Sequence, residues 1–191
     1  MAEIEITERT TLANRKYLLE NIRFKIRDRN GAIREQEREI YFRPDGAVLL
    51  LYNPGKQTIL FTRQFRLVAE LKHSGNELLE ACAGIIDPGE TPEEAAIREA
   101  EEELGYRVGG VEKVHEAFAT PGGVTEVIHF FIGKYDDGMK VNGGGGMEHE
   151  GEDIEIVELS FDEVRAMLKT GQVHDAKTII LIQHLLIKGI L

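Results

Sequence analysis

An acidic helix expected over residues 92–104 constrains this chain more than any other feature of its sequence. Thr91 is suited to the N-cap, Pro92 to the first helical position, and Glu94 completes a capping box with Thr91. Gly105 supplies the C-terminal stop. The last turn carries four glutamates, Glu99, Glu101, Glu102 and Glu103. Like charges three or four residues apart destabilise an isolated helix by about 0.2–0.5 kcal/mol per pair, so these carboxylates either face water or are compensated by a cation.

The spacing of these glutamates favours a metal site. Glu99 and Glu103 lie at i and i+4, on one face of the helix, with Glu102 beside them. A loop rich in turn residues, 84–90, precedes the helix. Mg²⁺ and Mn²⁺ accept a few carboxylates together with water and phosphate oxygens. The alternative is a solvated acidic face, which charged runs usually are.

The remaining pattern predicts an α+β fold. Alternating or continuously apolar segments predict strands over residues 17–28, 33–42, 46–52, 58–63, 77–83, 111–119, 127–134 and 153–159. The capping residues Ser160 and Asp175 predict two late helices, over residues 161–168 and from 175 to about 187. Residues 139–153, which include a run of glycines, are expected to form a flexible loop. The expected architecture is a mixed β-sheet with one helix early and two late.

Composition excludes several classes of protein. The chain has 191 residues with 23 basic and 34 acidic side chains, a net charge of −11. A uniformly acidic surface repels phosphodiester backbones, so nucleic-acid binding is not expected as the main activity. A single cysteine, Cys82, excludes a disulfide framework. No apolar stretch reaches the roughly 18 residues of a membrane span, and the N-terminus lacks the apolar core of a secretion signal, so an intracellular protein is expected.

The window from Gly84 to Tyr106 resembles the Nudix box. The matching positions are Gly84, Glu90, Arg98-Glu99-Ala100, Glu102-Glu103 and Gly105-Tyr106. Ala100 and Tyr106 stand where the family usually has a bulky aliphatic residue, a departure that concerns packing rather than chemistry. The resemblance implies an α/β/α sandwich, with the mixed sheet between helices, and Mg²⁺-dependent hydrolysis of a nucleoside diphosphate linked to another moiety.

The resemblance extends over nearly the whole chain. Residues 63–66 and 77–84 are similar to nucleoside diphosphate sugar pyrophosphatases, and Pro121 is typical of the members that act on ADP-ribose. Residues 121–131, 142–146, 152–159 and 169–171 are more similar still to bacterial GDP-mannose pyrophosphatases. This similarity implies a cytoplasmic homodimer. It also implies an N-terminal antiparallel β extension, residues 1–43, exchanged between subunits, and a Nudix domain over residues 44–191.

The resemblance also assigns roles around the acidic helix. Glu99 and Glu103 are expected to be the primary metal ligands, Glu102 an auxiliary ligand, and the carbonyl of Ala83 another. Arg98 is expected to pair with one of these carboxylates and orient it, as residues behind a metal ligand do. Glu90 either binds the metal through water or caps its loop.

A catalytic base and the substrate contacts are expected outside the box. By the same resemblance Glu152 is expected to be a metal ligand, the catalytic base, or both. Glu150 is the second choice, and an ordinary acidic loop is the alternative. The residues expected to contact the substrate are Arg38, Arg66, Glu126 and Lys177. Each of them alone is also compatible with a charge on the surface.

These assignments predict a Mg²⁺-dependent enzyme, with Mn²⁺ as a substitute, that hydrolyses a nucleoside diphosphate sugar. The first choice of reaction converts GDP-mannose to GMP and mannose 1-phosphate. The alternative, favoured by Pro121, converts ADP-ribose to AMP and ribose 5-phosphate. A rival of another class is a catalytically silent nucleotide-sugar-binding module, whose expected mark, loss of a metal glutamate or of Arg98, is not found.

Overall fold

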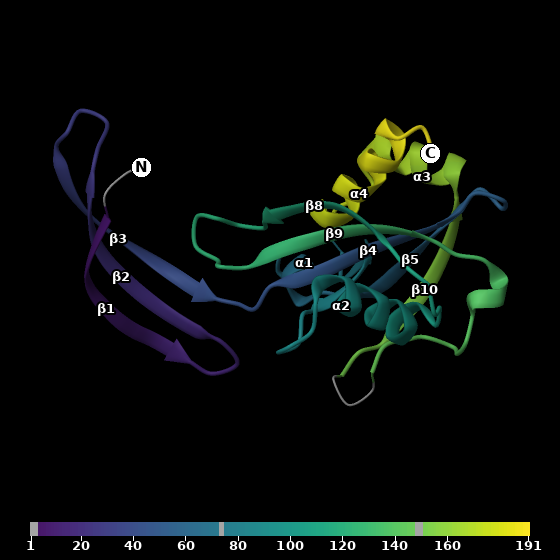
Figure 1. Cartoon of the computed structure of the whole chain (residues 1–191), viewed down its shortest axis with the longest axis horizontal. Helices are drawn as coiled ribbons and strands as arrows, with labels where there is room; N and C mark the ends of the chain where they lie inside the picture. Colours follow the sequence, from purple (N-terminus) through teal and green to yellow (C-terminus); the bar gives the residue numbers. More distant parts are fainter. Residues whose placement is uncertain (1–3, 73–74, 148–150) are drawn as a thin grey trace. The chain divides into compact units, whose positions relative to one another are not determined.

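The chain folds as two units, seen in a computed structural model that describes residues 4–72, 75–147 and 151–191 (Figure 1). The first unit is Met1–Asp45 with Ala117–Ile128, and the second is Gly46–Glu116 with His129–Leu191. None of the helices in these described ranges has the length and apolar composition needed to cross a membrane.

The first unit contains a three-stranded antiparallel sheet in the order β1-β2-β3. Its strands are β1 (Ile4–Asn14), β2 (Leu18–Arg27) and β3 (Ile33–Phe42). In the turn between β2 and β3, Gly31 adopts a φ of +84° and the Asp28 carboxylate accepts hydrogen bonds from the backbone N–H groups of Asn30 and Ala32. The predicted strands over residues 17–28 and 33–42 are therefore confirmed. Strand β1 was not predicted, because it is exposed along its whole length and shows no buried face.

A second sheet of seven strands carries the rest of the fold, in the order β10-β5-β4-β9-β8, with β6 paired to β5 and β7 to β4. The strands are β4 (Gly46–Asn53), β5 (Thr58–Phe65), β6 (Glu77–Glu80), β7 (Cys82–Ile85), β8 (Glu112–Phe118), β9 (Val127–Lys134) and β10 (Ile154–Ser160). Central strand β4 is buried at every position, as its continuous apolar sequence predicts.

Helices cover both faces of this sheet, which gives the expected α/β/α sandwich (Figure 1). On one face, Leu49 and Leu51 of β4 pack in a core that includes Ala96 of helix α2. Because side chains alternate along a strand, the intervening residues of β4 point to the other face, where helix α4 contacts the strand. The helices are α1 (Leu67–Leu71), α2 (Pro92–Glu99), α3 (Phe161–Thr170) and α4 (Ala176–Ile187).

Two local features differ from the prediction. Residues 77–83 do not form one strand, because β6 pairs with β5 while β7 pairs with β4, so the backbone passes from one neighbour to the other at Ala81. The N–H of Ala81 instead donates a hydrogen bond to the hydroxyl of Thr178, at 2.7 Å. The short helix α1 was also not predicted, and three of its residues, Leu67, Val68 and Leu71, are exposed.

Helix α2 begins as its sequence predicts and ends in an unexpected turn. The capping box between Thr91 and Glu94 is present in both directions. After Glu99 the chain widens into a π-helical turn over Ala100–Leu104, and Gly105 then leaves the helix with a φ of +79°. Such π turns occur frequently at functional sites, and this one carries three of the four clustered glutamates.

Candidate active site

Glu103 is the deepest acidic group of the glutamate cluster. It lies on the π-helical turn with only 1% of its surface exposed, and its Oε2 accepts a hydrogen bond from the N–H of Ala83, at 3.2 Å. The pKa of Glu103 is raised to about 8. Burial is the main cause and the charges of Glu99 and Glu152 contribute, while hydrogen bonds from Cys82 and Ala83 act in the opposite direction. A carboxyl group in this position binds a proton or a cation near neutral pH.

Glu99 lies against strand β7 because that strand has no side chain at Gly84. A Cβ atom built on Gly84 would be 1.7 Å from Oε1 of Glu99 and 2.1 Å from its Cδ. The glycine of the box therefore makes room for the carboxylate. Burial raises the pKa of Glu99 to about 7, with Glu102 and Glu152 adding to the shift and Arg98 opposing it.

Arg98 connects the helix to the loop in front of it. Its Nη1 donates hydrogen bonds to Glu99 at 2.7 Å and to Glu102 at 2.9 Å. Its Nε and Nη2 donate to both oxygens of Glu90, at 2.9 and 3.1 Å, and Nη2 also donates to the carbonyl of Ile85. Since Arg98 pairs with three carboxylates, it offsets part of the charge that the cluster concentrates.

The hydrogen bonds of Glu90 favour a role in capping its loop over a role as a metal ligand. Besides its two bonds from Arg98, its Oε2 accepts a hydrogen bond from the backbone N–H of Asp87 at 3.1 Å. The pKa of Glu90 is lowered, above all by the hydrogen bond from Arg98. The carboxylate thus closes the loop 84–90 and anchors the arginine.

The cluster has the donors that Mg²⁺ prefers, although they do not yet form a cage. Among the described residues, no three His, Cys, Asp or Glu side chains converge as metal ligands, and Glu99 and Glu102 are both paired with Arg98. The chemistry of the set nevertheless fits a hard divalent cation, since three carboxylates and nearby backbone oxygens are oxygen donors. Burial, together with the neighbouring carboxylates, raises the pKa values of Glu99 and Glu103, and a bound cation would favour their ionised forms.

Glu152 approaches the same cluster from the loop before β10. Its Oε2 accepts a hydrogen bond from the N–H of Met147 at 3.0 Å, and its charge acts on both Glu99 and Glu103. A pocket of about 570 Å³ lies next to the glutamate cluster, whose Glu101 and Glu102 belong to its lining. Its lining residues are Arg98, Glu101, Glu102, Asn142, Gly143, Gly144, Gly146 and Met147. Glu150, the second choice for the base, lies outside the described residues.

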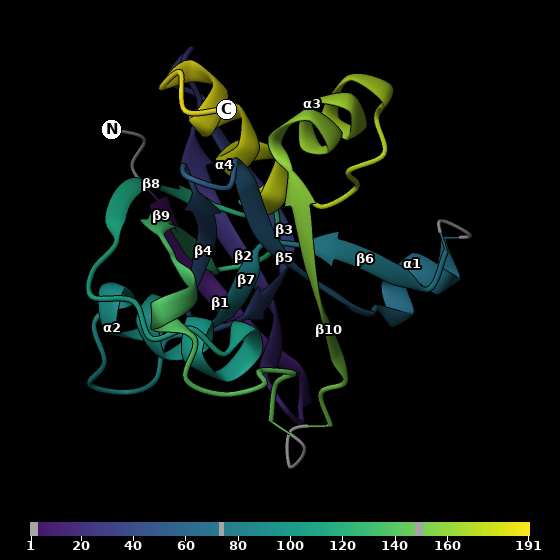
Figure 2. The ribbon, with the colours of Figure 1, turned by 90° about the vertical axis from the view of Figure 1, so that its right-hand side faces the viewer.

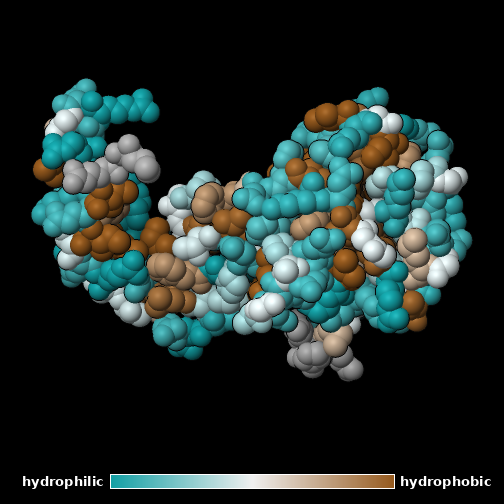
Figure 3. Space-filling model, viewed as in Figure 1, coloured by the Kyte–Doolittle hydropathy of each residue, from teal (hydrophilic) through white to brown (hydrophobic). Residues whose placement is uncertain are grey.

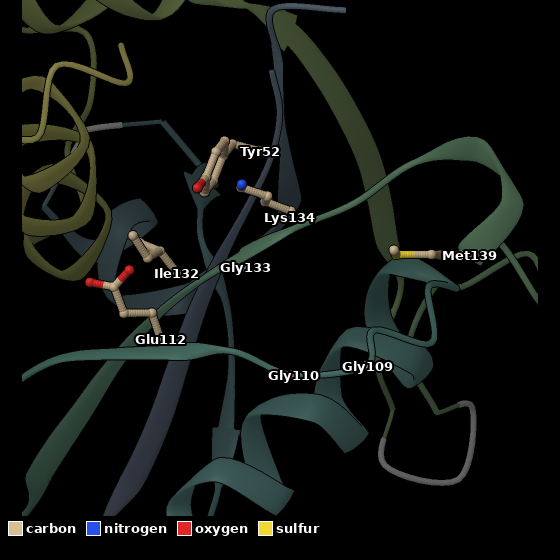
Figure 4. Close-up of a pocket in the computed structure, with 8 residues that line it drawn as sticks. All are labelled: Tyr52, Gly109, Gly110, Glu112, Ile132, Gly133, Lys134 and Met139. Atoms are coloured by element: carbon tan, nitrogen blue, oxygen red, sulfur yellow. The ribbon is translucent and has the colours of Figure 1, made fainter. Parts of the chain in front are cut away.

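Another pocket, of about 330 Å³, shares no lining residue with the first (Figure 4). It is lined by Tyr52, Gly109, Gly110, Glu112, Ile132, Gly133, Lys134 and Met139. Its one carboxylate, Glu112, is already paired with Lys188 at 2.8 Å. The first pocket, which borders the glutamate cluster, is therefore the candidate active site.

Two of the expected substrate contacts lie in the same unit as the cluster, each paired with an acidic group. Arg66 donates to both oxygens of the buried Glu80, the shortest bond being 2.6 Å. The hydrogen bonds that Arg66 donates to Glu80 raise the pKa of Arg66, and the charges of Glu80, Glu103 and Asp175 contribute. Lys177 donates to Asp175 at 2.6 Å. These acidic partners were missed in the sequence, where a glutamate in a short strand and a helix N-cap suggested no such role.

The other two expected substrate contacts belong to the first unit. Arg38 lies on β3 and is exposed, and its guanidinium donates to Gln36 and to the carbonyl of Glu37. Glu126 pairs with Arg43 at 3.4 Å. The structure therefore brings Glu99, Glu102, Glu103, Arg98 and Glu152 together with Ala83, and it places Arg38 and Glu126 in the other unit.

Two protein-family models match the chain. Residues 42–181 match the NUDIX domain, and residues 3–41 match the GDP-mannose pyrophosphatase NudK N-terminal domain. The chain belongs to the Nudix family.

Several relatives align over nearly the full length of the chain. A GDP-mannose pyrophosphatase of Pectobacterium atrosepticum is 47% identical over 97% of this chain and 95% of its own. The enzymes of the same name from Citrobacter koseri and Escherichia coli strain K12 are 44% and 42% identical, each over 96% of this chain and 95% of its own. A crystal structure of an ADP compounds hydrolase superposes with a TM-score of 0.70 at 19% identity, covering 98% of this chain and 95% of its own. The expected Nudix fold is thereby confirmed.

Replacing Gly84 by alanine is predicted to weaken metal binding. The new Cβ would occupy the position of the Glu99 carboxylate, and displaced ligands or their supports typically cost about 10–100-fold in metal affinity. Titration with Mn²⁺, followed by the electron paramagnetic resonance signal of the free ion, measures the effect without any substrate. Gly110→Ala is the matched control, since no atom lies within 4 Å of its added Cβ. Equal Mn²⁺ affinity in both variants would contradict the assignment.

The raised pKa values also predict how pH affects the metal-free protein. The folded-state pKa values of Glu99 and Glu103, about 7 and 8, lie above the ordinary 4.5, so the folded state binds protons more tightly than the unfolded chain. This stabilisation is complete below about pH 4.5 and is lost as pH rises through 7 and 8. Melting temperatures in chelator should therefore fall over that range, and Mg²⁺ should restore stability at the alkaline end.

The variant Glu103→Gln isolates this effect from other titrating groups, such as His184, whose pKa burial lowers. Glutamine keeps the size of the side chain and cannot ionise. The difference between the wild-type and Glu103→Gln melting profiles should therefore grow with pH. Profiles of melting temperature against pH that run parallel would show that the raised pKa of Glu103 does not contribute to the pH dependence of stability.

Proposed function

We propose that this protein hydrolyses the diphosphate bond of GDP-mannose, in the presence of Mg²⁺, to give GMP and mannose 1-phosphate. The observation that carries the proposal is a cluster in which the buried Glu103 lies in electrostatic range of Glu99 and Glu152. Two residues next to it, Arg98 and Glu102, line an open pocket. The substrate follows from the relatives, which are named GDP-mannose pyrophosphatases and align over nearly the whole chain.

Within this proposal, each residue of the cluster has a distinct task. Glu99 and Glu103 would hold the cation as primary ligands, with Glu102 and the carbonyl of Ala83 as additional donors. When bound, Mg²⁺ would supply positive charge against the phosphates and an activated water. Arg98 orients Glu99 and Glu102 through the hydrogen bonds it already donates to them. Mn²⁺ is expected to substitute, because it accepts the same oxygen ligands.

Glu152 is proposed as the general base. The proposal is supported by the electrostatic effect of its carboxylate on both Glu99 and Glu103, which shows that the three groups lie in one site. A positioned base contributes typically about 10²–10⁴-fold to the rate. Glu150 remains the second candidate.

The basic groups are proposed to contact the anionic substrate. Arg66 and Lys177 are each held by one carboxylate, Glu80 and Asp175, so their positions are set before a phosphate arrives. Arg38 and Glu126 are proposed to contact the nucleotide or the sugar. Fixed partners of this kind reduce the entropy that a flexible side chain loses on binding.

A comparison of substrates tests the proposal. Initial rates should be highest with GDP-mannose, lower with ADP-ribose, and absent without divalent cation, with GMP and mannose 1-phosphate as products. Glu103→Gln should abolish most turnover, because it removes a ligand charge without changing the shape of the side chain. A preference for ADP-ribose would replace the first choice of substrate, and tight binding of GDP-mannose without hydrolysis would favour a binding module.

We also propose that the protein is a cytoplasmic homodimer in which the β extension, residues 1–43, is exchanged between subunits. Apolar side chains are exposed on the three-stranded sheet, where Ile4, Ile6, Leu12 and Ile33 are each about half exposed or more (Figure 3). Monomeric proteins rarely leave large contiguous apolar patches in water. A second copy of the chain is therefore the proposed partner of this sheet.

The mass in solution tests the dimer. Light scattering after size exclusion should give twice the 21.5 kDa of one chain. The double variant Ile4→Glu, Ile6→Glu should shift the protein towards the monomer, because two charges would be buried at the interface. Glu39→Lys, a charge change at an exposed position of strand β3, is the control. A wild-type protein with the mass of one chain would overturn the proposal.

A further inference from the structure

The glycine run, residues 143–146, was expected to be part of a flexible loop, but its backbone is bonded to the turn that carries the metal-ligand glutamates. The N–H of Gly145 donates to the carbonyl of Glu103 at 2.9 Å, and that of Gly146 donates to the carbonyl of Glu102 at 3.1 Å. Carbonyls at the C-terminal end of a helix have no partner within the helix. The glycine run supplies those partners, and Figure 2 shows the segment passing along the end of this helix before β10 begins.

The residues just before the glycine run also donate hydrogen bonds to the carbonyls of the π-helical turn and of Gly105. The N–H of Val141 donates to the carbonyl of Gly105 at 2.8 Å, and the side-chain amide of Asn142 donates to the carbonyl of Glu101 at 3.2 Å. Carbonyls of Glu101, Glu102, Glu103 and Gly105 are therefore all bonded from one short segment. A segment held by four such bonds does not move independently of the turn.

Two positions of the run require glycine for steric reasons. Gly144 has a φ of +62°, and a Cβ there would lie 2.5 Å from the carbonyl oxygen of Glu103. Gly146 has a φ of +80°, and its Cβ would lie 2.6 Å from Oε2 of Glu152. L-residues with side chains rarely adopt this backbone conformation. Any side chain at Gly144 would therefore push the run away from the turn.

The far end of the run determines where Glu152 lies. The Glu152 carboxylate accepts its hydrogen bond from Met147, the residue that follows the run. The N–H of Ile154 donates to the carbonyl of Gly145 at 3.2 Å. The chain on both sides of Glu152 is thus fastened to the same glycines that bond Glu102 and Glu103.

We propose that Gly144 and Gly146 are positioning residues, which hold the Glu152 carboxylate at a fixed separation from Glu99 and Glu103. The inference rests on the proposed function, in which Glu152 is the base and the other two hold the cation. Its consequence is that base and ligands form one rigid body through the backbone. A displacement of about 1 Å in such an arrangement can lower the rate about 10²-fold.

Gly144→Ala tests the proposal without altering any acidic group. With Mg²⁺ and GDP-mannose, kcat should fall by about 10²-fold, because the base is displaced. The KM should change by less than about threefold, because an interaction lost only in the transition state lowers kcat alone. Wild-type kcat in Gly144→Ala would overturn the inference.

Two alanine variants separate positioning from general destabilisation. Gly109→Ala has no atom within 4 Å of its Cβ and no positive φ, and Gly109 does not line the candidate active-site pocket, so its kcat should equal that of the wild type. Gly171→Ala has a φ of +70° with open space around it, so it should lower the melting temperature as Gly144→Ala does while keeping kcat. A loss of kcat in Gly171→Ala that matches its loss of stability would overturn the inference.

A double-mutant cycle shows whether Gly144 acts through Glu152. In a Glu152→Gln background, Gly144→Ala should cost less than about threefold further in kcat, because the group that it positions is already absent. Independent, multiplying losses would refute the positioning role. An active wild type with unimpaired Glu152→Gln would also refute it while leaving the hydrolase intact. A wild type that hydrolyses no nucleotide sugar would overturn the proposed function itself, and the inference with it.

Discussion

Burial of several carboxylates in one place is the constraint on which the rest of this structure depends. An ionised carboxylate loses its hydration when it is buried, so it must be paired, hydrogen-bonded or protonated. Glu103 is almost fully buried with Glu99 and Glu152 in electrostatic range, and Arg98 provides one positive charge for Glu90, Glu99 and Glu102. The remaining deficit of positive charge makes this group of residues suited to a divalent cation.

Glycine is what allows the backbone to approach these carboxylates. Gly84 leaves space for Glu99, and Gly144 and Gly146 bring the loop before β10 against Glu103 and Glu152. The site is therefore assembled from three pieces of chain: β7, the π-helical turn and the glycine run. Strand β7 contacts the Glu103 side chain, whereas the glycine run contacts the turn through main-chain hydrogen bonds. Contacts of that kind are rigid, because they contain no side-chain torsions that can relax.

Much of the fold and the centre of the site could be predicted, because both depend on local patterns. The capping box of Thr91 and Glu94 and the alternation of the strands are short-range signals, and the structure confirms them. Strand β1 and helix α1 were missed because their apolar residues remain exposed and give no buried face. The break at Ala81 could not be predicted from the sequence either, because it arises from the pairing of β6 with β5 and of β7 with β4.

By itself the sequence determined the acidic helix, the spacing of its glutamates and the membership of the Nudix family, because those are properties of residues close together along the chain. Only the tertiary structure decided which charged side chains form ion pairs with one another and which are buried. It paired Arg66 with Glu80 and Lys177 with Asp175, and it turned an expected flexible loop into the cap of the π-helical turn. The physical reason is that pairing and burial depend on segments far apart in sequence, whose approach is set by packing and hydrogen bonding of the folded chain.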